Sequence, residues 1–211
     1  MDEPSPTEIR LVGNLALPEN ATLLHFWKWA FGDLCDDDLK GYFAEWMVRV
    51  LMGLPLTRRV SWADSDIITP CGLRIEVKSS AYWQSWKLVN EDGTRKPMPP
   101  PVDPARKKVV FGGLRSGTSV DTSPQLTAPA FKSDIYVFCL HTQTDPTAWD
   151  AWQLSHWEFY ALTRTELEER GIGKSITLGV LRKLCPMMTA AEFRTRMQAL
   201  LAINSPRPAS L

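Results

Sequence analysis

Residues 61–86 read SWADSDIITPCGLRIEVKSSAYWQSW, two runs of β-forming residues on either side of a turn. The turn is Pro70-Cys71-Gly72. Proline presets φ for the first turn position, and glycine accepts the left-handed conformation that closes a three-residue loop. We therefore predict a β-hairpin in which Ile67 pairs with Ile75.

This hairpin is expected to bring two carboxylates together. In the same register Asp66 lies across from Glu76, with their Cβ atoms about 4.5–5.5 Å apart, and Glu76 shares a face with Lys78 because side chains alternate along a strand. Two carboxylates this close repel each other, whereas Mg²⁺ prefers such oxygen ligands. Lys78 is then placed to orient a water or to offset charge on a phosphoryl oxygen. The alternative interpretation is a solvated hairpin face with an ordinary Glu–Lys pair.

An amphipathic helix is expected directly upstream of the hairpin. Asp36-Asp37-Asp38 supplies an N-cap and favourable negative charge, and Gly53 ends the helix. Glu45 lies on the flank of its apolar stripe, where a surface carboxylate is the simplest interpretation. The apolar positions recur at helical spacing, namely Leu39, Tyr42, Phe43, Trp46, Met47, Val50 and Leu51.

Taken together, Glu45, Asp66 and Glu76-Val77-Lys78 resemble the motif of the PD-(D/E)XK nuclease superfamily, which includes many restriction endonucleases and Holliday-junction resolvases. The chain departs from the motif at Ser65, where the name of the motif has proline. Asp64 is a rival for the first acid, since in the hairpin register it lies opposite Lys78.

The resemblance implies an α/β fold with a central mixed β-sheet flanked by α-helices, restriction endonuclease-like. It implies hydrolysis of DNA phosphodiester bonds with Mg²⁺, for which Mn²⁺ is expected to substitute. Asp66, Glu76 and Glu45 would hold the metal, and Lys78 would complete the catalytic set. A restriction-type or phage-defence endonuclease is the leading subtype, and a DNA repair or Holliday-junction nuclease is the alternative.

Positive charge collects after the motif. The chain of 211 residues has a formal net charge of zero, but residues 74–132 carry 10 Lys and Arg against 5 Asp and Glu. Residues 90–130 are rich in proline and glycine, so we interpret them as a loop-rich, DNA-facing insertion; a solvated loop with incidental charge is the alternative. The residues predicted to contact DNA are Arg106, Lys107, Lys108, Arg115 and Gln84.

The remaining pattern predicts a single domain over residues 21–204, a loosely held lead over 1–20 and a polar tail over 205–211. Thr22 is a candidate cap for a first helix, and Thr189 for the last. Further predicted elements are a helix at 22–31, strands at 56–60, 108–111, 134–140 and 152–162, a helix at 164–170, a strand or helix entry at 175–178 leading into 181–184, and a final helix after residue 189.

The four cysteines are widely spaced, which argues against a zinc site or a disulfide framework. No apolar run approaches the length of a membrane span, and no signal core is present. We therefore expect a cytoplasmic protein with DNA as its partner, no membrane partner and, as an option, a homodimer. Two hypotheses of another class remain: a catalytically silent DNA-binding domain on the same fold, and a partner-binding domain that uses exposed aromatic residues and the proline-rich loop.

Overall fold

A computed structural model describes residues 4–12, 19, 21–60, 63–84, 90, 94, 96–117 and 129–204. Half of the predicted lead at 1–20 lies inside these ranges, whereas the tail at 205–211 and about a third of the insertion at 90–130 lie outside them. The chain divides into two compact units, Met1–Leu34 and Cys35–Leu211. Each unit is described by itself.

The first unit contains helix α1 (Leu23–Phe31). Thr22 is its N-cap, as predicted, and the Thr22 hydroxyl oxygen accepts a hydrogen bond from the His25 backbone N–H at 3.3 Å. None of the α1 side chains is buried, and Phe26 and Trp29 are among the exposed aromatic residues.

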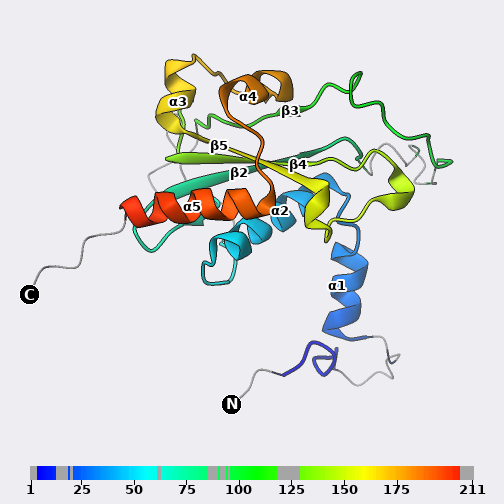
Figure 1. The fold of residues 1–211 in the computed structure, drawn as a ribbon. Helices are drawn as coiled ribbons and strands as arrows, with labels where there is room; N and C mark the ends of the chain where they lie inside the picture. Colours follow the sequence, from blue (N-terminus) through cyan, green and yellow to red (C-terminus); the bar gives the residue numbers. More distant parts are fainter. Residues whose placement is uncertain are drawn as a thin grey trace, which may run out of the picture. The chain divides into compact units, whose positions relative to one another are not determined.

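The second unit is built on a four-stranded mixed sheet. Its strands are β1 (Ile67–Ile68), β2 (Arg74–Ala81), β4 (Ile135–His141) and β5 (Trp157–Thr163), in the spatial order β1-β2-β4-β5. β2 and β4 are parallel, and the other two pairings are antiparallel. All seven residues of β4 are buried, as expected of a central strand covered on both faces. The α/β class with a mixed sheet and flanking helices is confirmed (Figure 1).

One face of the sheet is covered by α2 (Asp37–Met52) and α5 (Ala190–Asn204) (Figure 1). Asp36 caps α2 by accepting from two backbone N–H groups, and Gly53 ends it with a φ of 70°. Phe193 of α5 stacks on Phe159 of β5, with ring centroids 4.9 Å apart. The predicted bounds of both helices are confirmed at their caps.

The predicted apolar stripe of α2 is partly wrong. Ala44 and Val48 are fully buried against the sheet side, whereas Tyr42, Trp46 and Val50 are exposed. Small residues let a helix backbone approach a sheet closely, so Ala44 and Val48 turn inward. Phe43 and Met47 of the predicted stripe are also buried, whereas Tyr42 and Trp46 lie at the margin.

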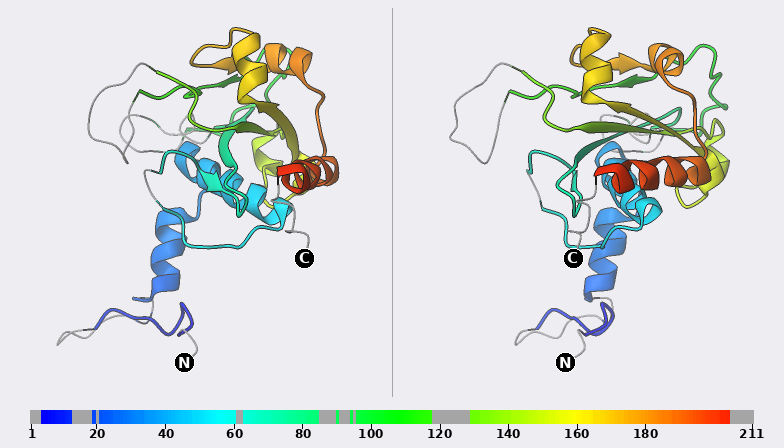
Figure 2. Two further views of the ribbon diagram at one scale, coloured as in Figure 1. Left: turned by 90° about the vertical axis from the view of Figure 1, so that its left-hand side faces the viewer. Right: turned by 60° about the vertical axis from the view of Figure 1, so that its left-hand side comes forward.

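The opposite face carries a smaller layer, seen from two further directions in Figure 2. It contains β3 (Val110–Phe111) paired with β6 (Ile176–Thr177), and the short helices α3 (Arg164–Glu169) and α4 (Leu178–Leu184). These elements bury the aromatic face of β4 and β5 in one core cluster that includes Phe111, Tyr136, Phe138, Tyr160, Leu162, Leu167 and Leu181. Glu76 and Lys78 alternate onto this same face of β2.

Several predicted strands change in extent. Residues 56–60 form no strand, and Leu56 and Val60 are exposed, so this run lacks the buried face that a strand needs. The strand predicted at 152–162 begins only at Trp157, because Leu154–His156 forms a 3₁₀ turn. The segment 108–111 is extended, but only its last two residues pair as β3. At residues 175–178 both alternatives occur, since β6 leads directly into α4.

Candidate active site

The hairpin places the predicted first acid at the edge of β2. Ile67 pairs with Ile75, which confirms the predicted register. The backbone N–H of Val77 donates to Asp66 Oδ2 at 2.8 Å. The Asp66 carboxylate is therefore bonded to the residue of β2 that lies between Glu76 and Lys78. The group that donates to Asp66 is thus a backbone N–H whose position is fixed by the sheet.

Asp66 lies among like charges. Burial raises the pKa of the Asp66 carboxyl to about 7, and the negative charges of Glu76 and Glu45 add to the effect. The Val77 N–H and the Lys78 ammonium act in the opposite direction and only partly compensate. Asp66 therefore lies within electrostatic range of the other two acids that the sequence singled out, Glu76 of β2 and Glu45 of α2.

Glu76 and Lys78 form an ion pair on the sheet face. Lys78 Nζ donates to Glu76 Oε1 at 2.7 Å, and the two side chains are only 18% and 22% exposed, respectively. A Cβ atom placed on Gly113 would lie 3.4 Å from Lys78 Nζ, and Gly113 has a φ of +66°. The segment that follows β3 thus contacts the lysine. The Glu–Lys pair of the alternative interpretation is present, but it is largely covered rather than solvated.

Glu45 has a basic partner that sequence analysis missed. Arg59 donates from Nε and Nη2 to the two Glu45 carboxylate oxygens at 2.6 and 3.0 Å, and its guanidinium lies 4.4 Å from the centre of the Tyr42 ring. Hydrogen bonding to Glu45 is the main cause that raises the pKa of Arg59. The sequence offered only a pair of arginines after a helix, which is an ordinary surface pattern.

Two buried serines complete the surroundings of Glu76. Ser133 Oγ lies 2.8 Å from Ser65 Oγ and 3.5 Å from Glu76 Oε2. Ser65 is the residue at the motif's proline position, and Ser133 is the second residue before β4. No local sequence signal marks Ser133. Its partners Glu76 and Ser65 lie 57 and 68 residues upstream, and the parallel pairing of β2 with β4 brings that part of the chain beside it.

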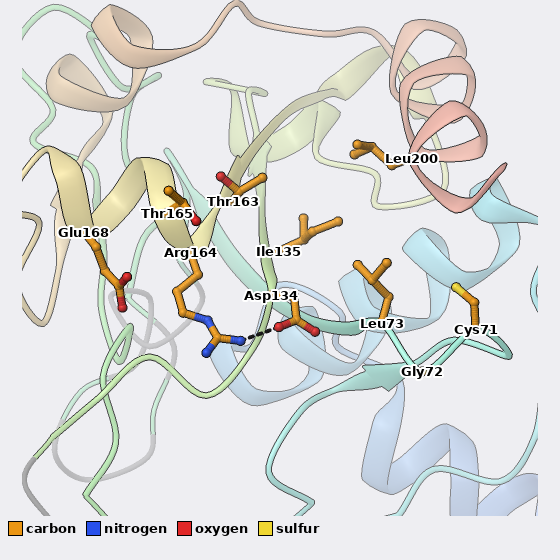
Figure 3. A pocket seen from close by; sticks show the side chains of 10 residues that line it. All are labelled: Cys71, Gly72, Leu73, Asp134, Ile135, Thr163, Arg164, Thr165, Glu168 and Leu200. Carbon is orange, nitrogen blue, oxygen red and sulfur yellow. Dashed lines mark hydrogen bonds and ion pairs between the residues drawn. The ribbon is translucent and has the colours of Figure 1, made fainter. Parts of the chain in front are cut away.

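An open cavity of about 670 Å³ lies at the end of the sheet where β2 and β4 begin (Figure 3). Arg164, at the start of α3, reaches across it and forms an ion pair with Asp134. Arg164 Nε also donates to the Ser133 carbonyl at 3.2 Å. The cavity and the carboxylate cluster therefore share the turn at Ser133 and Asp134.

The predicted DNA-contacting residues lie in less buried places. The Arg106 side chain is 90% exposed and lies 3.4 Å from an Asp103 oxygen, while Lys108 is exposed and Lys107 half-buried. Arg115 is half-buried, with its guanidinium 4.4 Å from the centre of the Phe131 ring. Gln84, a few residues beyond β2, is half-buried. Arg115 lies two residues after Gly113, the glycine that contacts Lys78.

The chemistry of the donor set suits a hard divalent cation, since all three clustered acids are carboxylates. Within the described ranges, however, no three histidine, cysteine, aspartate or glutamate side chains are already arranged as a metal-binding group. Glu45 and Glu76 instead engage Arg59 and Lys78. The three acids are thus of the kind that binds a hard cation, but Glu45 and Glu76 contact basic side chains in this structure.

Two further findings concern the chain as a whole. Among the described residues, none of the helices combines the length and the apolar character needed to span a bilayer. Comparison of the sequence and the structure with family models, curated proteins and solved structures finds no match.

Proposed function

We propose that this chain is a Mg²⁺-dependent DNA endonuclease of the PD-(D/E)XK superfamily, with a restriction endonuclease-like fold. The observation that carries the proposal is the setting of Asp66: burial raises its pKa to about 7, and the negative charges of Glu76 and Glu45 add to that rise. Like charges placed together destabilise a fold, and such arrangements are characteristic of functional sites. The motif supplied each of these residues independently of the fold.

In this proposal Asp66, Glu76 and Glu45 would hold the metal. A bound Mg²⁺ would supply positive charge for the phosphoryl group and for the leaving oxygen of an in-line displacement. Mn²⁺ is expected to replace it, because it also accepts carboxylate ligands.

Lys78 is placed to act on the substrate. Its ammonium group is 2.7 Å from Glu76 and is confined between the sheet and the Gly113 segment. Confinement fixes the direction of its hydrogen bonds before substrate arrives, which makes a charge-stabilising contact more effective. Lys78 would hold the attacking water or donate to a phosphoryl oxygen as negative charge develops there.

Basic residues along the insertion would position the DNA. The exposed Arg106 and Lys108 are suited to phosphate contacts, which give affinity without base specificity. Arg115, held over Phe131, presents a guanidinium of restricted orientation two residues after Gly113. A restriction-type or defence role is our leading subtype, and a repair or junction nuclease is the alternative.

The test is incubation of plasmid, linear duplex and single-stranded DNA with Mg²⁺, with Mn²⁺ or with EDTA. We expect metal-dependent cleavage that Asp66→Asn and Glu76→Gln abolish while DNA binding persists. Asp64→Asn is the matched control, since Asp64 is the neighbouring acid in the same segment. Loss of cleavage only in Asp64→Asn would transfer the role of first ligand to Asp64.

A catalytically silent DNA-binding domain is the second candidate. It is favoured by one observation, that Glu45 and Glu76 each contact a basic side chain and that the described carboxylates form no ready-made metal group. Retention of DNA in a gel-shift assay, with no cleavage in Mg²⁺ or Mn²⁺, would select this candidate.

A further inference from the structure

Ser65 and Ser133 form a buried hydroxyl pair beside Glu76. Their exposed fractions are 4% and 0%, and their Oγ atoms are 2.8 Å apart. A buried hydroxyl destabilises a protein unless it is hydrogen-bonded, so the two serines need each other. The pair joins the residue before Asp66 to the residues that lead into β4.

Ser133 is held rigidly by its backbone. Its N–H lies 3.3 Å from the Tyr136 hydroxyl oxygen, and its carbonyl accepts from Arg164 Nε at 3.2 Å. The next residue, Asp134, accepts from the Arg74 backbone N–H at 3.0 Å and pairs with Arg164. Contacts from β2, β4 and α3 therefore fix the direction in which the Ser133 side chain points.

That direction is toward the second oxygen of Glu76. Glu76 Oε1 accepts from Lys78 at 2.7 Å, and Glu76 Oε2 lies 3.5 Å from Ser133 Oγ. A hydroxyl has one hydrogen, so Ser133 donates either to Ser65 or to Glu76. When the Ser65 hydroxyl turns to donate to Ser133, the hydrogen of Ser133 becomes available to the carboxylate.

We propose that Ser133, supported by Ser65, is a positioning residue that orients the Glu76 carboxylate for a divalent cation. The same pair anchors the backbone immediately before Asp66. Ser65 stands where the motif has proline, and its hydrogen bond to Ser133 restrains the backbone there in place of a proline ring. This inference rests on the proposed function, because it assigns an outer partner to one of the proposed metal ligands.

The experiment measures Mn²⁺ binding to the full chain by calorimetry in the absence of DNA, beside single-turnover cleavage and thermal unfolding. Loss of an outer partner typically weakens metal affinity or activity by about 10–100-fold. Because the contact to Glu76 is long, we expect about tenfold weaker Mn²⁺ binding in Ser133→Ala and a smaller loss in Ser65→Ala. The double variant should be no worse than Ser133→Ala, since both serines act through one chain of hydroxyls.

Ser80→Ala is the matched control. Ser80 is also a buried serine, at 7% exposure, and alternates onto the same face of β2 as Glu76. Its replacement should leave Mn²⁺ affinity within about twofold of the parent, because Ser80 lies four residues beyond Glu76 along β2. If Ser133→Ala fails to fold, Ser65→Ala carries the test alone.

The outcomes separate the two proposals. Mn²⁺ affinity unchanged in both serine variants, in a parent that binds Mn²⁺ and cleaves DNA, would overturn the positioning role and leave the nuclease intact. An equal loss in Ser80→Ala would also overturn it, because general packing would then explain the effect. A parent that neither binds Mn²⁺ nor cleaves DNA would remove the proposed function and this inference with it.

Discussion

Replacing Asp66 with asparagine removes one charge from the carboxylate cluster while keeping the shape of the side chain. Asparagine can still accept the hydrogen bond that Asp66 Oδ2 receives from the Val77 N–H at 2.8 Å. The variant therefore removes the cost of ionising a buried carboxyl beside Glu76 and Glu45. In EDTA, with no divalent metal, we expect Asp66→Asn to be more stable than the parent at neutral and alkaline pH.

The magnitude follows from the pKa of Asp66, which is raised from 3.8 to about 7 by burial and then by the two neighbouring acids. Between these values the native protein binds a proton that the unfolded chain has lost. The stabilising contribution is thus complete below pH 3.8 and disappears as the pH rises through about 7. A difference of about three pKa units corresponds to about 4 kcal/mol. Because Asp66 keeps partial contact with solvent, we expect about half of that, or about 2 kcal/mol.

The assay is urea unfolding of both proteins in EDTA, followed by tryptophan fluorescence from pH 5 to pH 8.5. The advantage of Asp66→Asn should grow with pH and reach about 2 kcal/mol in the free energy of unfolding at pH 8. Buried His141, whose pKa is lowered to about 4 chiefly by burial, destabilises the fold on acidification in both proteins, so it cancels in the difference. A pH-independent difference, or a less stable variant at pH 8, would refute the charge cluster.

Three other changes test the remaining parts of the site. Lys78→Ala should lower the single-turnover cleavage rate by about 10²–10³ with little change in DNA affinity, and a rate within about twofold of the parent would remove Lys78 from the mechanism. Alanine at all three residues 106–108 should flatten the plot of log K against log salt by about 0.9 for each phosphate that the protein no longer neutralises; an unchanged slope would return this segment to a solvated loop. Gly113→Ala strains a positive-φ position and adds a methyl group in contact with Lys78 Nζ, so it should slow cleavage. Gly53→Ala, with a similar positive φ and open space around it, should cost only stability, about 1–2 kcal/mol. Equal cleavage rates in the two glycine variants would contradict the first effect.

The hairpin could be predicted from sequence because its determinants are local. Proline and glycine fix a short loop, and the loop length fixes the register that pairs Ile67 with Ile75. The caps of α2 and α5 follow from side chains that bond to backbone groups within three residues. Buried β4 follows from an unbroken apolar run.

What the sequence could not provide depends on contacts between distant segments. The side of α2 that faces the sheet was misjudged because two adjacent helix faces carry apolar residues, and only the fit to β2 selects Ala44 and Val48. Arg59 meets Glu45 across 14 residues, and Ser133 meets Ser65 across 68. Such partners carry no periodic signal, since their separation is set by the packing of the whole unit.

The contacts of the three acids also suggest the order in which they would respond to a cation. Glu45 is bonded twice to Arg59, and Glu76 is paired with Lys78, so each already lies beside one positive charge. Asp66 instead accepts a backbone N–H, and burial together with the two neighbouring acids raises its pKa to about 7. At the proposed metal site, Asp66 is therefore the acid that would have to release a proton in order to hold a divalent cation. Glu76 and Glu45 could then turn toward the metal, and the release of Lys78 from Glu76 would make its ammonium group available to a phosphate oxygen.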